Sequence, residues 1–145
     1  QILQGLPKMK KAATSKELKR GFDRHVKQTR EQVRRLERIF KALGASPRGK
    51  KCVGMEGLLK EGASLIRERP DPDVLDAGLI AAAQHVEHYE MAGYGTVRTW
   101  AKVLGYSDQA RLLQQTLDEE GKTDKELTKL ARTINVDAES QDEMN

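Results

Sequence analysis

Two glutamates, Glu87 and Glu90, occupy inward-facing positions in a long helical pattern. On an α-helix, residues spaced alternately three and four apart fall along one stripe. Between residues 80 and 104 that stripe contains Ile80, Ala83, Glu87, Glu90, Tyr94, Val97, Ala101 and Leu104. A buried carboxylate needs a partner or a cation, and two carboxylates about one turn apart suit a shared metal ion. Two other interpretations stay open: both side chains are solvated, or they pair with a buried Lys or Arg.

Two further helical patterns also place polar residues at mid-height, with apolar residues above and below. The stripe of the earlier one contains Leu18, Phe22, His25, Gln28 or Thr29, Gln32, Leu36, Ile39 and Leu43. The stripe of the last one contains Leu113, Thr116, Leu117, Glu120, Thr123 or Asp124, Leu127, Ala131 and Ile134. Opposite two carboxylates, His25 and Glu120 become candidate metal ligands, with Gln28 and Asp124 in the first or second ligand shell. The alternatives are a hydrogen-bonded core histidine and polar layers that only fix helix register.

Start and stop signals predict where these helices lie. Residues 1–13 resemble the last turns of a helix, and Gln1 carries no start signal, so we expect this first helix to be truncated. Thr14 or Ser15 can cap a helix that runs to about residue 43, and Asp71 followed by Pro72 starts one that runs to residue 104. A weaker helix is expected over residues 52–68 and a last one over residues 107–135. We expect residues 136–145 to form a polar, frayed tail.

The connections predict the architecture. Four helical patterns are joined by short, long and short connections, and the long one carries the short extra helix. This arrangement is typical of an all-α, antiparallel four-helix bundle with one crossover, formed here by residues 1–135 as one domain. In such bundles, inward carboxylates and histidines hold two metal ions.

Composition agrees with a helical protein and excludes several classes. The chain has 145 residues, of which 33% are charged and 4% aromatic, with 4 prolines. No run of 18 apolar residues predicts a membrane span, and no signal-peptide pattern is visible. The single Cys52 excludes an internal disulfide and fits a reducing cytoplasm, where we expect the protein to act. No Gly-rich phosphate loop and no Gly-x-Ser-x-Gly motif occurs.

Charge is divided between the two halves of the chain. Residues 1–69 hold 19 Lys and Arg against 7 Asp and Glu, whereas residues 70–145 hold 7 against 15. Such halves attract each other within one fold or between subunits, and in the second case they would help to pair copies in a homodimer or higher homo-oligomer. The basic face from Arg24 to Arg38 lacks the aromatic residues of single-strand binders, so we do not expect nucleic-acid binding.

The chain resembles the YciF/YciE-like stress-response proteins of bacteria, a branch of the ferritin-like superfamily. The resemblance covers nearly the whole chain in order. It is carried by Leu6-Pro7-Lys8-Met9, the His25…Thr29…Gln32-Val33 helix, residues 51–58, residues 77–90, and residues 115–120 with Thr123-Asp124. It implies a ferritin-like four-helix bundle, a dimer and a cytoplasmic stress role without a settled activity. The family tends to have Glu where this chain has Gln28, and a neutral amide is a poorer ligand for a hard cation.

Two functional hypotheses follow. In the first, two Fe or Mn ions bind to His25, Glu87, Glu90 and Glu120, and the protein oxidises Fe(II) or detoxifies oxygen species. In the second, the bundle is metal-free and non-catalytic, and it acts through homo-oligomerisation or partner binding. Whether the protein is an enzyme stays open at this point.

Overall fold

The computed structural model describes residues 1–142 and consists of five α-helices there. Their bounds are Ile2–Ala12 (α1), Lys16–Ala42 (α2), Val53–Glu68 (α3), Pro72–Val103 (α4) and Ser107–Asp142 (α5). The order matches the prediction: α1 is short, and α3 is the extra helix on the long crossover between α2 and α4. None of the described helices is long and apolar enough to cross a membrane.

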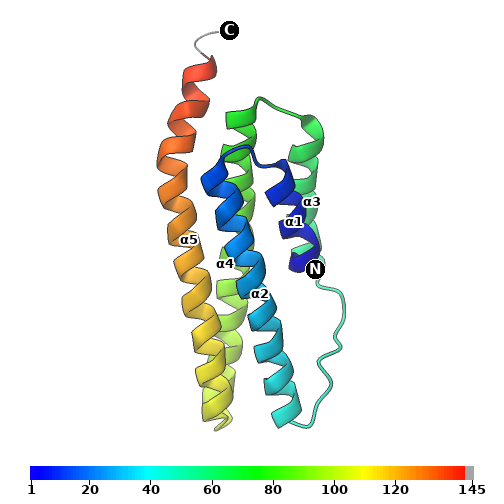
Figure 1. The fold of residues 1–145 in the computed structure, drawn as a ribbon. Coiled ribbons are helices and arrows are strands. Elements are labelled where there is room, and N and C mark those ends of the chain that lie inside the picture. The colour runs from blue at the N-terminus through cyan, green and yellow to red at the C-terminus, as the bar shows by residue number, and fades with distance from the viewer. Residues whose placement is uncertain (143–145) are drawn as a thin grey trace.

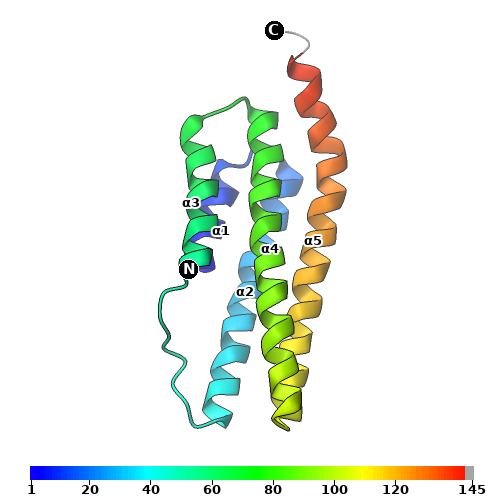
Figure 2. The same cartoon turned by 180° about the vertical axis from the view of Figure 1, so that it is seen from behind.

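The long helices α2, α4 and α5 run side by side, and α4 and α5 form an antiparallel hairpin (Figures 1 and 2). The short α1 packs on α2 and α3, and α3 packs on α4. Both short helices lie beside one half of the bundle only. The other half, near the α4–α5 turn, therefore consists of three helices with an extended crossover segment alongside. The all-α bundle predicted from the sequence is confirmed.

Turn chemistry sets the helix ends. The side chain of Ser15 accepts a hydrogen bond from the Leu18 N–H, which makes Ser15 the N-cap of α2. Pro72 occupies the first turn of α4, as predicted. Gly105 joins α4 to α5 with φ at +78°, a conformation that favours glycine. The last helix continues through Asp142, although the sequence favoured a frayed segment from residue 136; residues 143–145 lie outside the described part.

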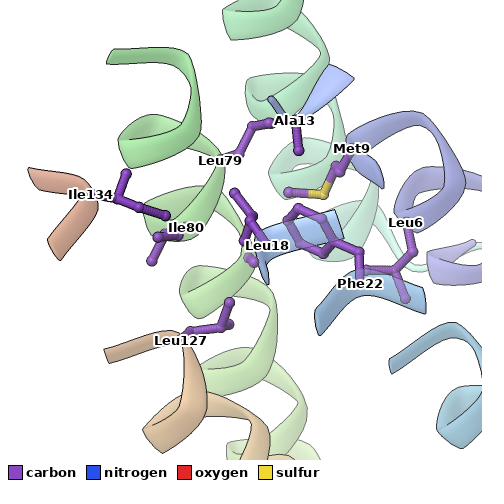
Figure 3. Close-up of a cluster of buried hydrophobic side chains, with 10 residues drawn as sticks. Leu6, Met9, Ala13, Leu18, Phe22, Leu79, Ile80, Leu127 and Ile134 are labelled. Atoms are coloured by element: carbon purple, nitrogen blue, oxygen red, sulfur yellow. The ribbon is translucent and has the colours of Figure 1, made fainter. Parts of the chain in front are cut away.

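Two apolar clusters fill the bundle at different heights. The larger one joins α1, α2, α4 and α5 (Figure 3) and contains Leu6, Met9, Ala13, Leu18, Phe22, Leu79, Ile80, Ala83, Leu127 and Ile134. The smaller one, nearer the α4–α5 turn, contains Ile39, Ala101, Ala110 and Leu113. Between them the inward positions of α2, α4 and α5 are polar, which is the layered arrangement that the sequence predicted.

A buried aspartate ties the α1–α2 connection to α4. Asp76 accepts hydrogen bonds from the Thr14 N–H and hydroxyl, both at 2.7 Å, and from the Ser15 N–H at 2.5 Å. Asp76 is fully buried, so these three donors compensate its loss of hydration. This clasp fixes the start of α2 against α4 and thereby sets the height of the polar layer on α2.

Candidate metal centre

Four of the six predicted site residues converge in the polar layer. His25 comes from α2, Glu87 and Glu90 come from α4, and Glu120 comes from α5. One potential ligand atom from each lies within 4.8 Å of those from the other three. His25 Nε2 is 3.0 Å from Glu87 Oε1 and 4.0 Å from Glu120 Oε2. Three separate helices therefore direct one imidazole and three carboxyl groups at a common point.

These side chains are removed from water and lack hydrogen-bond partners. The exposed fraction is 3% for His25, 1% for Glu87 and 0% for Glu120, and Glu90 is half-buried. Both oxygens of Glu87 and Glu120, Glu90 Oε2 and both ring nitrogens of His25 are buried without a hydrogen bond. Within residues 1–142, neither Lys nor Arg forms an ion pair with these three carboxyl groups. Native proteins seldom leave so many buried polar atoms without partners.

Burial changes the acid–base behaviour of the carboxyl groups. It is the main cause that raises the pKa of Glu87, Glu90 and Glu120, each to about 8. The charge of Glu120 raises the pKa of Glu90 further, and Glu87 does the same to Glu120. Three carboxylates at this distance cannot all ionise at neutral pH unless positive charge is placed among them.

The donor set fits a divalent transition metal ion. Carboxylate oxygens and an imidazole nitrogen together suit ions such as Fe(II) and Mn(II). A cation would give the carboxyl oxygens that lack hydrogen bonds a positively charged partner, and it would favour the ionised form of these groups. The two interpretations that involve no metal fare worse, because Glu87 and Glu120 are shielded from solvent and none of the three carboxyl groups pairs with a Lys or Arg in the described part of the chain.

The other two predicted residues lie at the edge of the cluster, and their role as ligands stays a prediction. Gln28 is half-buried, and its Oε1 accepts a hydrogen bond from Thr123 at 3.3 Å. Asp124 points to the outer side of α4, where Oδ1 contacts Gln84 Nε2 at 3.0 Å and His88 Nε2 at 3.1 Å. Both side chains thus hold partners outside the group of four converging donors.

An adjacent buried ion pair was missed by sequence reasoning. Arg35 was predicted on the basic outer face of its helix, and this prediction was wrong. Its guanidinium group donates to both Glu119 oxygens at 2.9 Å and to the Thr116 hydroxyl at 2.6 Å. Gln32 donates to the same Glu119 carboxylate at 3.2 Å. The two-pronged pairing allows Arg35 to be buried; the only sequence signal was the acidic pair formed by Glu119 and Glu120.

The exposure of side chains in the structure contradicts several other positions that were predicted to face inward. On α2 the buried residue is Thr29 rather than Gln28. Leu43 and Leu104, predicted at the ends of two stripes, are exposed. Leu43 and Leu104 follow the C-terminal ends of α2 and α4, and those ends lie in the half of the bundle that α1 and α3 do not cover. His85 and His88, which lie off the inward-facing stripe of α4, are exposed.

Comparison with known proteins identifies the family. The chain is 41% identical to protein YciF of Escherichia coli (strain K12) over 143 residues, which cover 97% of this chain and 86% of the relative. The crystal structure of the E. coli stress protein YciF matches with a TM-score of 0.88 and 41% identity, covering 91% of this chain and 84% of that one. YcfI from Rhodopseudomonas palustris matches with a TM-score of 0.85 and 42% identity, covering 88% and 81% of the two chains. A family described as a domain of unknown function, DUF892, matches residues 1–139. The chain therefore belongs to the DUF892 family of YciF-like proteins.

Proposed function

We propose that this chain is a metal-binding member of the stress-response family, and that His25, Glu87, Glu90 and Glu120 hold Fe(II) or Mn(II). The observation that carries the proposal is the set of orphaned, buried donor atoms that lie within 4.8 Å of one another. The E. coli relative is described as a stress protein, which agrees with such a role. When bound, a redox-active ion with an open position supplies oxidation of Fe(II) or removal of reactive oxygen species.

The number of ions follows from the available donors. Two ions were expected from the sequence, with Gln28 and Asp124 as additional ligands. Both hold hydrogen bonds elsewhere, and Glu119 is committed to Arg35. Four donors suffice for one ion that keeps an open position, so we infer one ion per chain in place of two.

Each of the four residues has a defined task in this proposal. His25 would contribute a neutral ring nitrogen, and Glu87, whose Oε1 lies 3.0 Å from His25 Nε2, would contribute a carboxylate oxygen beside it. Glu90 and Glu120 contribute charge from opposite helices. The apolar layers above and below exclude water from the cluster, which strengthens the interaction between the carboxylates and a cation.

Metal analysis tests the proposal. Protein purified without chelator and then loaded anaerobically with Fe(II) or Mn(II) should contain about one equivalent per chain, because the four donors are preorganised. Glu87→Gln combined with Glu120→Gln should abolish retention, whereas Glu17→Gln, an exposed change at the start of α2, should not. Less than about a tenth of an equivalent in the wild type would refute metal binding. Two equivalents would refute only the single-ion inference.

Association without metal is the second candidate, and one observation favours it. At the end of α4 the exposed fractions are 61% for Trp100, 80% for Val103 and 68% for Leu104. Clustered exposed apolar side chains are typical of contact surfaces, and the predicted homo-oligomer would cover them with a second copy. Trp100→Gln should then lower the mass measured by light scattering. An unchanged mass would argue against this surface.

A further inference from the structure

A cavity of about 260 Å³ leads from the surface between α2 and α5 to the four-residue cluster. His25 and Glu87 form its inner end, and Phe22, Ala83 and Leu127 form apolar walls. Of the four cluster residues, these two line this cavity, so it reaches the cluster from the α2 and α5 side. Gly21 also lines the cavity, and the space beside it is open, since a Cβ at Gly21 would meet only Leu130 Cδ1 within 4 Å, at 3.9 Å.

The outer part of the cavity presents hydrogen-bond donors and few acceptors. Lys122 lines it and forms no ion pair among the described residues. Arg24 pairs with Glu126 at 3.2 Å, which occupies the one carboxylate at the opening. The side-chain oxygen of Gln28 faces the Thr123 hydroxyl at 3.3 Å, and the Gln28 side-chain NH2 group has no acceptor in the described part of the chain.

The pair at the opening does not close the cavity firmly. Arg24 and Glu126 are both exposed, with exposed side-chain fractions of 61% and 41%. Exposed ion pairs contribute little stability, so this contact can open at small cost. A ligand that enters meets free donors from Lys122 and Gln28 first and the cluster last.

We propose that this cavity is a binding site for a small anion of a few atoms, which reaches the open position of the metal ion from the His25 and Glu87 side. The inference rests on the proposed function, because the carboxylates at the inner end would repel an anion if no cation lay among them. The donors of Lys122 and Gln28 at the opening, where the Glu126 carboxylate is already paired with Arg24, favour an acceptor-bearing, negatively charged ligand. Metal binding and anion binding are thus coupled, and the anion should not bind to the metal-free protein.

Azide is the probe, and the visible absorption of bound Co(II) is the readout. The full chain is loaded with one equivalent of Co(II) and titrated with azide, and metal content is measured in every sample. We expect azide to change the Co(II) spectrum of the wild type. Gly21→Leu, which fills the cavity from α2, should weaken azide at least about tenfold, since the route is blocked. Gly21→Ala, which fits the available space, is its matched control and should bind azide like the wild type.

A second variant does not alter the core. Lys122→Gln should weaken azide by about threefold, as expected for one exposed charge, with Co(II) content unchanged. Lys41→Gln makes the same charge change at the far end of α2 and should have no effect. Wild-type azide affinity in both Gly21→Leu and Lys122→Gln would overturn the anion site while leaving metal binding intact. A Co(II) spectrum insensitive to azide would also overturn it. A chain that retains no metal would overturn the proposed function and this inference together.

Discussion

In the metal-free protein, the free energy of unfolding should decrease as the pH rises from about 5 to about 8. The pKa of Glu87, Glu90 and Glu120 is raised from 4.5 to about 8 in the folded protein. In the unfolded chain these carboxyl groups lose their protons near pH 4.5, whereas the folded protein retains them until about pH 8. The folded state therefore binds more protons in this window. Its free energy of unfolding is highest below the window and decreases as the pH rises through it.

The size of the effect follows from the number of retained protons. Each one contributes a slope of about 1.4 kcal/mol per pH unit. Three independent groups would give about 4 kcal/mol per pH unit. The three carboxyl groups lie beside one another, His25 on α2 lies 3.0 Å from Glu87, and the charge of Asp124 on α5 also acts on the pKa of Glu87. They should titrate as a coupled set, so one proton, or about 1.4 kcal/mol per pH unit, is the smallest slope we expect.

Urea denaturation followed by circular dichroism, in the presence of chelator and at several pH values, measures this slope. The double variant Glu87→Gln with Glu120→Gln lacks two of the titrating groups and should show a much flatter profile and a higher stability at neutral pH. Saturating Mn(II) should reverse the trend in the wild type, because the ion binds the deprotonated carboxylates. A metal-free wild type whose stability stays constant or increases over this range would refute the reasoning. An equal decline in the double variant would assign the effect to other groups.

Three further outcomes can be measured on single variants. Arg35→Met leaves the half-buried Glu119 carboxylate without its ion-pair partner and should lower the free energy of unfolding by about 3 kcal/mol in urea. Arg35→Met with Glu119→Met should recover most of this loss. Asp76→Ala removes the acceptor for three hydrogen bonds and should lower the midpoint of thermal unfolding, with a loss of about 3 kcal/mol; an unchanged midpoint would contradict the role of the clasp. Asp124→Ala should leave the metal content at one equivalent, while Glu120→Ala should abolish it; loss of metal in Asp124→Ala would instead make Asp124 a ligand.

Helical spacing alone was enough to place three of the four converging residues in the interior. His25, Glu87 and Glu120 each lie between apolar residues that recur three and four apart, so burial of those neighbours also buries them. Glu90 follows the same pattern on α4 but is only half-buried. Glu90 lines a pocket beside Ile2 of α1 and Leu36 of α2, and spacing on one helix carries no information about how closely its neighbours pack.

Residues that depend on a partner from another helix were beyond sequence reasoning. Gln28 and Thr29 are adjacent in the sequence, and the pattern left both open. The packing of α2 in the bundle puts Thr29 inside and leaves Gln28 at the edge, beside Thr123. Arg35 was predicted to be solvated because a lone charge is costly to bury. Only the approach of Glu119, 84 positions away, reverses that expectation.

The Asp76 clasp also affects where the helix bundle can open locally. Because three hydrogen bonds pin the α1–α2 corner to α4, the bundle has a fixed pivot at that end. The opposite end, near the α4–α5 hairpin turn, is held by the smaller apolar cluster and by the Arg35–Glu119 ion pair, and no comparable clasp to α4 is found there among the described residues. Thermal fluctuations should therefore separate α2 from the α4–α5 hairpin mainly at the end near the hairpin turn. Hydrogen exchange should accordingly be faster around Ile39 than around Leu18.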